Sequence, residues 1–132
     1  MARERDKPVI LIADDDPYII SDLESIFSTE GYNCITTGDG KTVLQIFAEE
    51  RPAILVLDLK LPRIDALKII EEIVPRFPDV QIIVISGQGS IDHAVQAIKC
   101  GAFDYIEKPF EPQRILLTLR NALDVFRLRS TN

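Results

Sequence analysis

Two patterns of hydrophobic and polar residues alternate along the chain, and each of them occurs five times. Short apolar runs such as residues 9–13 are typical of strands that lie inside a parallel sheet and are covered on both faces. Each run is followed by a longer segment in which apolar residues recur every three or four positions, as in an amphipathic helix. The expected strands are 9–13, 33–37, 54–57, 81–85 and 104–107.

Proline and glycine mark the ends of the helices between these strands. Pro17 suits the first turn of a helix, and Gly31 ends that helix. A turn at 38–40 precedes a second helix, which Pro52 ends. The remaining helices are expected over 65–77, 90–100 and 112–127. Strict alternation of strand and helix predicts an α/β fold, a doubly wound five-stranded parallel sheet with helices on both faces.

Length and charge narrow the class of protein. The 132 residues suit one domain over 9–127, after an N-terminal extension over 1–8 and before the start of a linker over 128–132. The net charge of -6 argues against direct binding of nucleic-acid phosphates by this domain. No apolar run reaches the ~20 residues of a membrane span, and no signal peptide is recognisable, so we expect a cytoplasmic protein without membrane contact.

The two cysteines and the single histidine do not match the spacing of a disulfide framework or a metal site. Cys34 and Cys100 match neither a disulfide framework nor a zinc site, so we expect reduced residues that are buried as small hydrophobes. His93 lies inside an expected helix without a ligand residue three or four positions on, and is expected on the surface.

Three of the expected strands end in residues that suit one phosphate chemistry. Asp14 and Asp15 follow the first strand, Asp58 closes the third, and Lys108 follows the fifth. Because parallel strands end at the same edge of a sheet, these carboxylates and one ammonium group should meet there. Carboxylates packed together repel unless a cation joins them. The edge therefore calls for a hard divalent ion with oxygen ligands, of which Mg²⁺ is the best match.

A hydroxyl completes the chemistry of this edge. Ser86 ends the fourth strand, and Gly87 leaves the space beside it open. A metal ion, a carboxylate, a hydroxyl and an ammonium group together suit phosphoryl transfer, in which a carboxylate oxygen attacks in line. The chain has no glycine-rich phosphate loop, so a nucleoside triphosphate is not the expected donor.

With these residues in this order, the chain resembles a receiver domain of a two-component response regulator over residues 9–126. The resemblance implies the flavodoxin-like, CheY-like fold with strand order 2-1-3-4-5. It makes Asp58 the phospho-acceptor and Asp14 and Asp15 the acidic pair, with Asp15 touching Mg²⁺ directly. The backbone carbonyl of Lys60 would complete the protein ligands of the ion.

The resemblance also gives roles to residues at the other strand ends. Ser86 would bond a phosphoryl oxygen, and Lys108 would pair with the phosphoryl group. Tyr105 occupies the aromatic switch position of the family and would turn inward on phosphorylation. The bond between Lys108 and Pro109 corresponds to a cis peptide bond in the family.

The loop after Asp58 departs from the family pattern at two positions. Leu61 stands where Met is common, and Ala66 stands where Gly is usual. If the backbone at Ala66 has a positive φ, alanine is strained there. Lys60 and Gln88 are expected to flank the approach of water, which predicts a comparatively long-lived phosphorylated state.

A finer resemblance lies in residues 86–110. The segments SGQGSI at 86–91 and GAFDYIEKPF at 101–110 resemble the nitrogen-regulator class of enhancer-binding transcription activators. That resemblance implies an N-terminal piece of a longer regulator with an ATPase domain and a DNA-binding domain. A sensor histidine kinase would supply the phosphoryl group.

The leading functional hypothesis is a phosphorylation-activated switch, which is not an enzyme proper and has only weak phosphotransfer and autophosphatase activity. The alternative is a Mg²⁺-dependent phosphohydrolase with an aspartyl nucleophile, because Asp14 and Asp16 resemble the haloacid-dehalogenase pair. Pro17 and Tyr18 follow where that family has Thr or Val, and the chain has no room for a cap domain. A pseudo-receiver that binds a partner without phosphorylation and a flavin-binding module are weaker alternatives.

The output surface is expected over residues 90–127, the last two helices and the last strand. Leu116, Leu119, Leu123 and Phe126 recur at helical spacing in the final helix. This stripe either packs on the sheet or, in its second half and with Leu128, continues into a dimerising helix. A homodimer through residues 90–127 is therefore a hypothesis, with the phosphorylated form as the tighter dimer.

Overall fold

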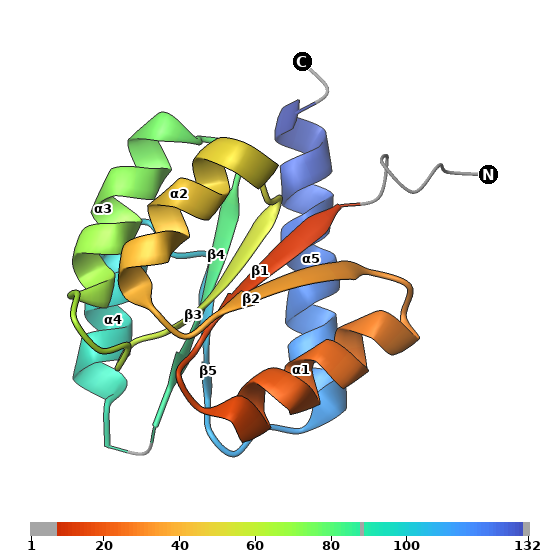
Figure 1. Ribbon diagram of the computed structural model, residues 1–132, viewed down its shortest axis with the longest axis horizontal. Helices are drawn as coiled ribbons and strands as arrows, with labels where there is room; N and C mark the ends of the chain where they lie inside the picture. The colour runs from red at the N-terminus through yellow and green to blue at the C-terminus, as the bar shows by residue number, and fades with distance from the viewer. Residues whose placement is uncertain (1–7, 88, 131–132) are drawn as a thin grey trace.

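Five parallel strands form a single sheet in the order β2-β1-β3-β4-β5 (Figure 1). The structure is a computed structural model and describes residues 8–87 and 89–130. The strands are β1 (Val9–Ala13), β2 (Asn33–Thr37), β3 (Ile54–Asp58), β4 (Gln81–Ser86) and β5 (Asp104–Glu107). The helices are α1 (Pro17–Thr29), α2 (Gly40–Glu50), α3 (Ala66–Arg76), α4 (Ile91–Cys100) and α5 (Pro112–Ser130). The predicted fold class and strand order are confirmed.

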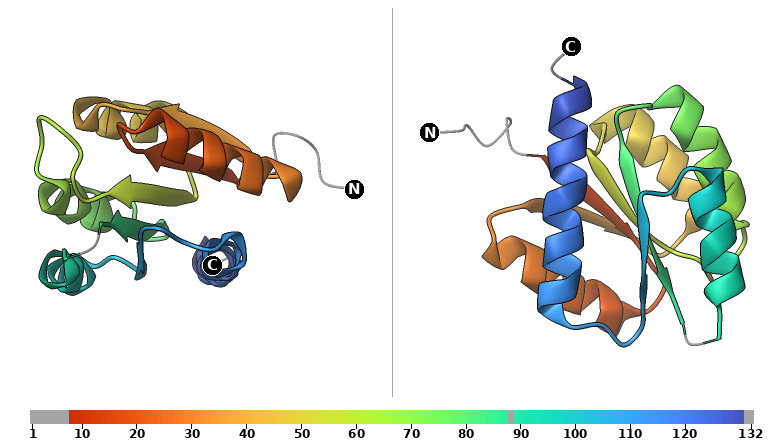
Figure 2. Two further views of the ribbon diagram at one scale, coloured as in Figure 1. Left: turned by 90° about the horizontal axis from the view of Figure 1, so that it is seen from below. Right: turned by 180° about the vertical axis from the view of Figure 1, so that it is seen from behind.

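The sheet separates two apolar cores, and the helices cover both of its faces (Figure 2). In β1, Ile10 and Ile12 join the core beneath α1 and α5, whereas Leu11 and Ala13 join the core beneath α2, α3 and α4. Successive side chains of a strand point to opposite faces. A strand that is buried on both faces is therefore apolar at every position, which explains the continuous runs in the sequence.

The register of the strands brings their carboxyl ends to one edge. Ala13, the last residue of β1, is level with Thr37 of β2 and with Leu57 of β3. Asp58 at the end of β3 is level with Ile85 of β4. The residues that follow these positions therefore meet at the same side of the sheet, as the sequence predicts.

Element boundaries differ little from the predicted ones. The strands β3 and β4 each run one residue further, through Asp58 and Ser86. The helix α5 continues to Ser130, three residues beyond the predicted end, and Leu128 on it is 72% exposed. Residues 1–7 of the predicted extension and 131–132 of the predicted linker lie outside the described part of the chain.

The backbone at Ala66 does not have the positive φ under which alanine would be strained. Ala66 is the first residue of α3 and has right-handed helical backbone, so alanine is unstrained there. The positive φ in this loop lies three residues earlier, at Arg63, where φ is 76°. Asp65 caps α3 through a hydrogen bond from the N–H of Leu67 at 3.0 Å. The family's glycine position is thus used here for ordinary helix backbone.

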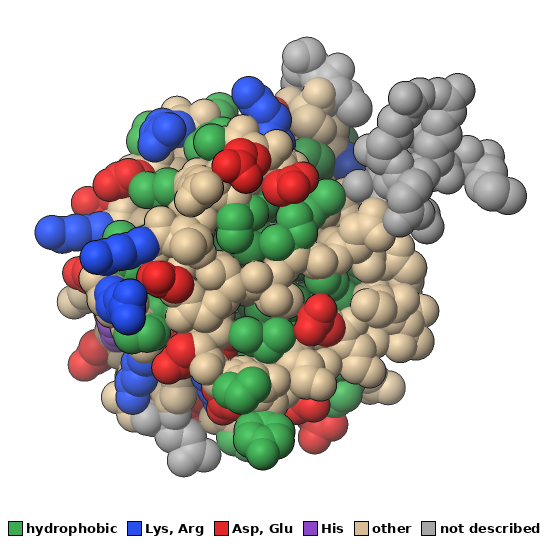
Figure 3. Space-filling view, viewed as in Figure 1, with side chains coloured by type: hydrophobic (Ala, Val, Ile, Leu, Met, Phe, Trp, Pro, Cys, Tyr) green, Lys and Arg blue, Asp and Glu red, His purple; other side chains and the backbone are tan. Residues whose placement is uncertain are grey.

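Acidic and basic side chains are interspersed over α2 and α3 on the face that Figure 3 shows. Among the described residues, no helix has the length and apolar character that crossing a membrane requires.

Candidate functional site

Three carboxylates meet at the carboxyl edge of the sheet. Asp14 and Asp58 are 1% and 4% exposed, while Asp15 is open to solvent. One oxygen from each of the three lies within 4.8 Å of the others, a grouping that could hold a metal ion. The structure thus brings together the three aspartates that the sequence predicts as metal ligands. Asp14 and Asp15 diverge in exposure because the strand ends between Ala13 and the acidic pair.

Asp14 is a buried carboxylate, and only one of its two oxygens accepts a hydrogen bond from the described residues. Its Oδ1 accepts a hydrogen bond from the N–H of Asp16 at 2.8 Å. Its Oδ2 is buried and has no hydrogen-bond partner within residues 8–87 and 89–130, although Nζ of Lys108 lies 3.2 Å away at ion-pair distance. Buried polar oxygens are nearly always satisfied. The unsatisfied oxygen therefore fits a hard cation, and the residues at this edge suit Mg²⁺.

Burial raises the pKa of Asp14 above its ordinary value of 3.8, and the neighbouring charge of Asp58 raises it further. The hydrogen bond from the N–H of Asp16 and the ammonium group of Lys108 act in the opposite direction. The carboxylates at this edge are therefore held together against desolvation and mutual repulsion.

Asp58 is positioned by the turn that follows it. Its Oδ1 accepts a hydrogen bond from the N–H of Lys60 at 3.0 Å, and its Oδ2 lies 3.6 Å from Nζ of Lys108. The N–H of Leu59 donates to the carbonyl of Ile85 at 3.1 Å, so β4 holds the start of this turn. Lys60 itself is exposed. The turn thus places the Lys60 peptide directly beside the Asp58 carboxylate.

Lys108 and Ser86 come from the neighbouring strand ends. The N–H of Lys108 donates to the carbonyl of Ser86 at 2.7 Å. Ser86 is buried, with 1% of its surface exposed. The peptide bond between Lys108 and Pro109 is cis, as the sequence resemblance implies. One ammonium group therefore faces both buried carboxylates, with a hydroxyl on the adjoining strand.

Tyr105 lies on β5, away from the carboxylates. It is level with Val84 of β4, is partly buried, and packs against the core beneath α2, α3 and α4. It also borders a surface pocket together with Phe110 and Arg114. A side chain between core and surface has the location that the predicted switch needs.

Asp16 does not join the carboxylate group. Its Oδ1 accepts a hydrogen bond from the N–H of Tyr18 at 2.9 Å, which caps α1 just ahead of Pro17. A helix cap is the ordinary use of an aspartate before a helix. The pairing of Asp14 with Asp16 that the phosphohydrolase alternative requires is therefore replaced by the pairing of Asp14 with Asp58.

The two cysteines and the histidine, to which the sequence assigns no role at the site, do not belong to the carboxylate cluster. Cys34 and Cys100 form no disulfide, and each is partly rather than completely buried. Burial raises the pKa of Cys34 to about 11. His93 on α4 is partly buried and belongs to no metal-ligating group among the described residues. Gln88 lies outside the described residues.

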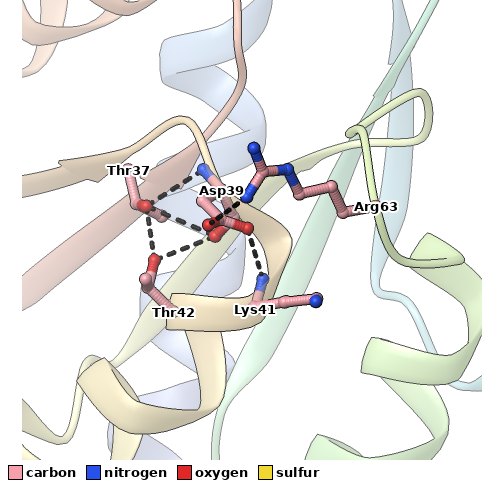
Figure 4. Close-up of polar contacts among 5 residues, drawn as sticks. All are labelled: Thr37, Asp39, Lys41, Thr42 and Arg63. Atoms are coloured by element: carbon pink, nitrogen blue, oxygen red, sulfur yellow. Dashed lines mark hydrogen bonds and ion pairs between the residues drawn. The ribbon is translucent and has the colours of Figure 1, made fainter.

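A polar cluster beside the site escaped the sequence analysis. The carbonyl of Thr37 accepts a hydrogen bond from the N–H of Asp14 at 3.0 Å, and Asp39 forms an ion pair with Arg63 at 3.8 Å. Figure 4 shows Thr37, Asp39 and Thr42 close together around the β2–α2 turn, with the guanidinium group of Arg63 reaching Asp39 from the β3–α3 loop. The sequence signal was Asp39 before a helix, which was interpreted only as part of a turn.

The strand order and the acidic edge with its lysine define an α/β signalling domain of the receiver type. The chain belongs to the response regulator receiver domain family, whose model matches residues 10–120. The predicted family and class of function are thereby confirmed.

Individual relatives agree with the finer resemblance to nitrogen regulators. The nitrogen assimilation regulatory protein NtrX of Azorhizobium caulinodans is 41% identical over 122 residues, which cover 91% of this chain and 27% of that protein. The regulatory protein AtoC of Escherichia coli is 30% identical over 88% of this chain and 25% of its own length. The chain spans about a quarter of the length of such relatives.

Solved structures show the same fold. The crystal structure of NtrX from Brucella abortus in complex with ADP matches with a TM-score of 0.88 and 35% identity, over 95% of this chain and 29% of that one. A response regulator receiver domain protein from Clostridium thermocellum matches with a TM-score of 0.86 and 28% identity, over 92% of this chain and 98% of that one.

Proposed function

We propose that this domain accepts a phosphoryl group on Asp58 while Mg²⁺ is held by Asp14, Asp15, Asp58 and the backbone carbonyl of Lys60. The observation that carries the proposal is the position of Lys108, whose Nζ faces Oδ2 of Asp14 at 3.2 Å and Oδ2 of Asp58 at 3.6 Å. An ammonium group shared by two buried carboxylates is well placed to pair with an incoming phosphoryl oxygen.

The donor is a phosphohistidine of a sensor kinase or a small acyl phosphate. An oxygen of the Asp58 carboxylate attacks phosphorus in line, and a new P–O bond forms as the bond to the donor breaks. The leaving imidazole or carboxylate keeps the electron pair of the broken bond. Bound Mg²⁺ offsets the charge of the phosphoryl oxygens. Lys108 pairs with one phosphoryl oxygen, and the hydroxyl of Ser86 donates to another.

The domain is a switch with weak phosphotransfer and autophosphatase activity rather than a phosphohydrolase. Asp16 supports this choice, since its side chain caps α1 and leaves Asp14 without the partner that a hydrolytic pair would need. The test is where the phosphoryl group resides. Trapping with borohydride and mass spectrometry should find it on Asp58, and a label on Asp14 would favour the hydrolase.

The output surface consists of α4, β5 and α5. On phosphorylation Ser86 moves toward the phosphoryl group, and Tyr105 turns into the space that it leaves. On α4, Ile91, Val95 and Ile98 are 45%, 41% and 38% exposed and share one helical face. This apolar face supports a homodimer within residues 90–127, with the phosphorylated form as the tighter dimer.

The stripe on α5 packs against the core, the first of the two interpretations that its spacing allows. Leu119 and Leu123 are fully buried in the core beneath α1 and α5, and Leu116 and Phe126 pack against that core. Leu117 and Leu128 are the exposed apolar residues of α5. The dimer contact therefore centres on α4. In the longer regulator, the output partners are an ATPase domain and a DNA-binding domain, while this acidic domain binds no nucleic acid itself.

A further inference from the structure

Asp39 divides its two carboxylate oxygens between two neighbouring segments. Its Oδ1 accepts a hydrogen bond from the N–H of Lys41 at 2.9 Å and so caps α2. Its Oδ2 lies 3.8 Å from a guanidinium nitrogen of Arg63 in the β3–α3 loop (Figure 4). Thr37 and Thr42 hold the turn through a hydroxyl pair at 2.5 Å, and the N–H of Asp39 donates to the Thr37 hydroxyl at 3.2 Å.

The β3–α3 loop also contacts the β2–α2 turn through an apolar side chain. Ile64 follows Arg63, and its Cγ2 methyl occupies the place that a Cβ at position 40 would need, so only glycine fits there. Leu59 and Leu61 anchor the start of the loop in the core, at 4% and 5% exposure. The loop is thus held at its start by two buried leucines and at its far end by the α2 terminus.

Both partners of this contact connect to the acidic site. The carbonyl of Thr37, two residues before Asp39, accepts the N–H of Asp14. On the other side, the loop that carries Arg63 also contains Lys60, whose N–H donates a hydrogen bond to Oδ1 of Asp58. The ion pair between Asp39 and Arg63 therefore joins the segment behind Asp14 to the loop behind Asp58.

We propose that Asp39 and Arg63 are positioning residues for the acidic site: their ion pair, with the Ile64–Gly40 contact, sets the β3–α3 loop so that Asp58 and the Lys60 peptide face the ion and the phosphoryl group. This inference rests on the proposed Mg²⁺ site. The pair is solvent-exposed, with the Arg63 side chain 69% and the Asp39 side chain 38% exposed. Exposed pairs contribute little, so we expect effects of about two- to fivefold rather than complete loss.

The variants are chosen to change charge without changing shape. Asp39→Asn keeps an oxygen for the N–H of Lys41, because asparagine caps helices as well as aspartate does. Arg63→Gln removes the other charge, and the double variant closes a mutant cycle. Glu30→Gln is the matched control, since it breaks the exposed ion pair between Glu30 and Arg120 on the far α1–α5 side.

The first measurement is hydrogen exchange without metal, in EDTA. The amides of Leu59 and Leu61 donate to Ile85 at 3.1 Å and to Asp58 at 3.3 Å, so their exchange reports whether the loop opens. Each single charge variant should speed exchange at both amides by about two- to fivefold. Exchange in the double variant should be about as fast as in either single variant. The control variant should leave the exchange rates of both amides unchanged.

The second measurement is a Mg²⁺ titration followed by amide NMR, which separates positioning from simple electrostatics. If only long-range charge mattered, Asp39→Asn would weaken Mg²⁺ binding and Arg63→Gln would tighten it. If the pair positions the loop, both variants weaken binding. Unchanged exchange in both single variants, or tighter binding in Arg63→Gln, overturns the proposal. A wild-type domain that binds no Mg²⁺ would refute the proposed metal site, and the exchange arm would still decide the loop's role.

Discussion

Nζ of Lys108 lies 3.2 Å from Oδ2 of Asp14, yet that oxygen has no hydrogen-bond partner among the described residues. The ammonium group lowers the pKa of the buried Asp14 carboxyl, but burial and the charge of Asp58 keep that pKa above its ordinary value. Asp14, Asp15 and Asp58 each bring one oxygen within 4.8 Å of the others, so Asp14 can share a cation with its two neighbours. The same ammonium group lies 3.6 Å from Oδ2 of Asp58, so it can pair with a phosphoryl oxygen attached to that carboxylate.

Replacing Asp58 with asparagine should stabilise the metal-free domain. Asp58→Asn keeps an acceptor for the N–H of Lys60 and removes a charge that raises the pKa of Asp14, while Lys108 keeps its pairing with Asp14. In EDTA we expect an increase of about 1 kcal/mol in the free energy of unfolding, measured by urea denaturation. A loss of stability would mean that the attraction between Asp58 and Lys108 outweighs the repulsion.

With Mg²⁺ bound, the wild-type domain should become more stable than Asp58→Asn. Mg²⁺ binds the folded state through the aspartate cluster, so it should raise the thermal midpoint of the wild-type domain. Asp58→Asn should respond far less, and Asp124→Asn, an exposed position on α5, should respond as the wild type does. Equal midpoints of the wild type with Mg²⁺ and with EDTA would contradict the predicted metal site.

Cys34 should be a poor nucleophile below pH 9. Its pKa is raised to about 11 by burial, so at pH 8 its alkylation by iodoacetamide should be about 100-fold slower than that of an ordinary thiol. The unfolded thiol ionises near its usual pKa, so the folded state should lose stability as the pH rises from about 9 toward 11. Peptide mass spectrometry after timed alkylation measures the rate, and Cys34→Ser should remove this part of the pH dependence.

Much of the fold could be predicted because each strand is short and apolar on both faces. Asp58 and Ser86 were placed at strand ends for the same reason, and the edge of a parallel sheet then brings their side chains together. The Asp39–Arg63 pair could not be predicted, since it joins two loops whose relative position depends on the packed sheet. The positive φ at Arg63 and the last turn of α5 also lack a periodic signal, because exposed residues are not constrained by a core.

Lys60 is predicted to lengthen the phosphorylated state. Its side chain is exposed and its N–H bonds the Asp58 carboxylate, so the side chain can cover the phosphoryl group and hinder water. Lys60→Ala should hydrolyse the aspartyl phosphate several-fold faster, and Gln88→Glu should do the same by orienting a water molecule. Lys41→Ala, another exposed lysine, is the control. Phosphate release from the isolated phosphorylated domain gives the rate, and unchanged rates in both test variants would refute the shielding.

Association of the phosphorylated domain should depend on α4. Val95 is 41% exposed in the middle of the apolar face between Ile91 and Ile98, so Val95→Asp places a charge where two copies would meet. With a beryllofluoride mimic of the phosphoryl group, sedimentation should show a dimer for the wild type and a monomer for Val95→Asp. Tyr18→Asp changes a side chain that is 79% exposed on α1 and should still dimerise. A wild-type domain that remains monomeric with beryllofluoride, or a Val95→Asp variant that still pairs, would place the contact elsewhere.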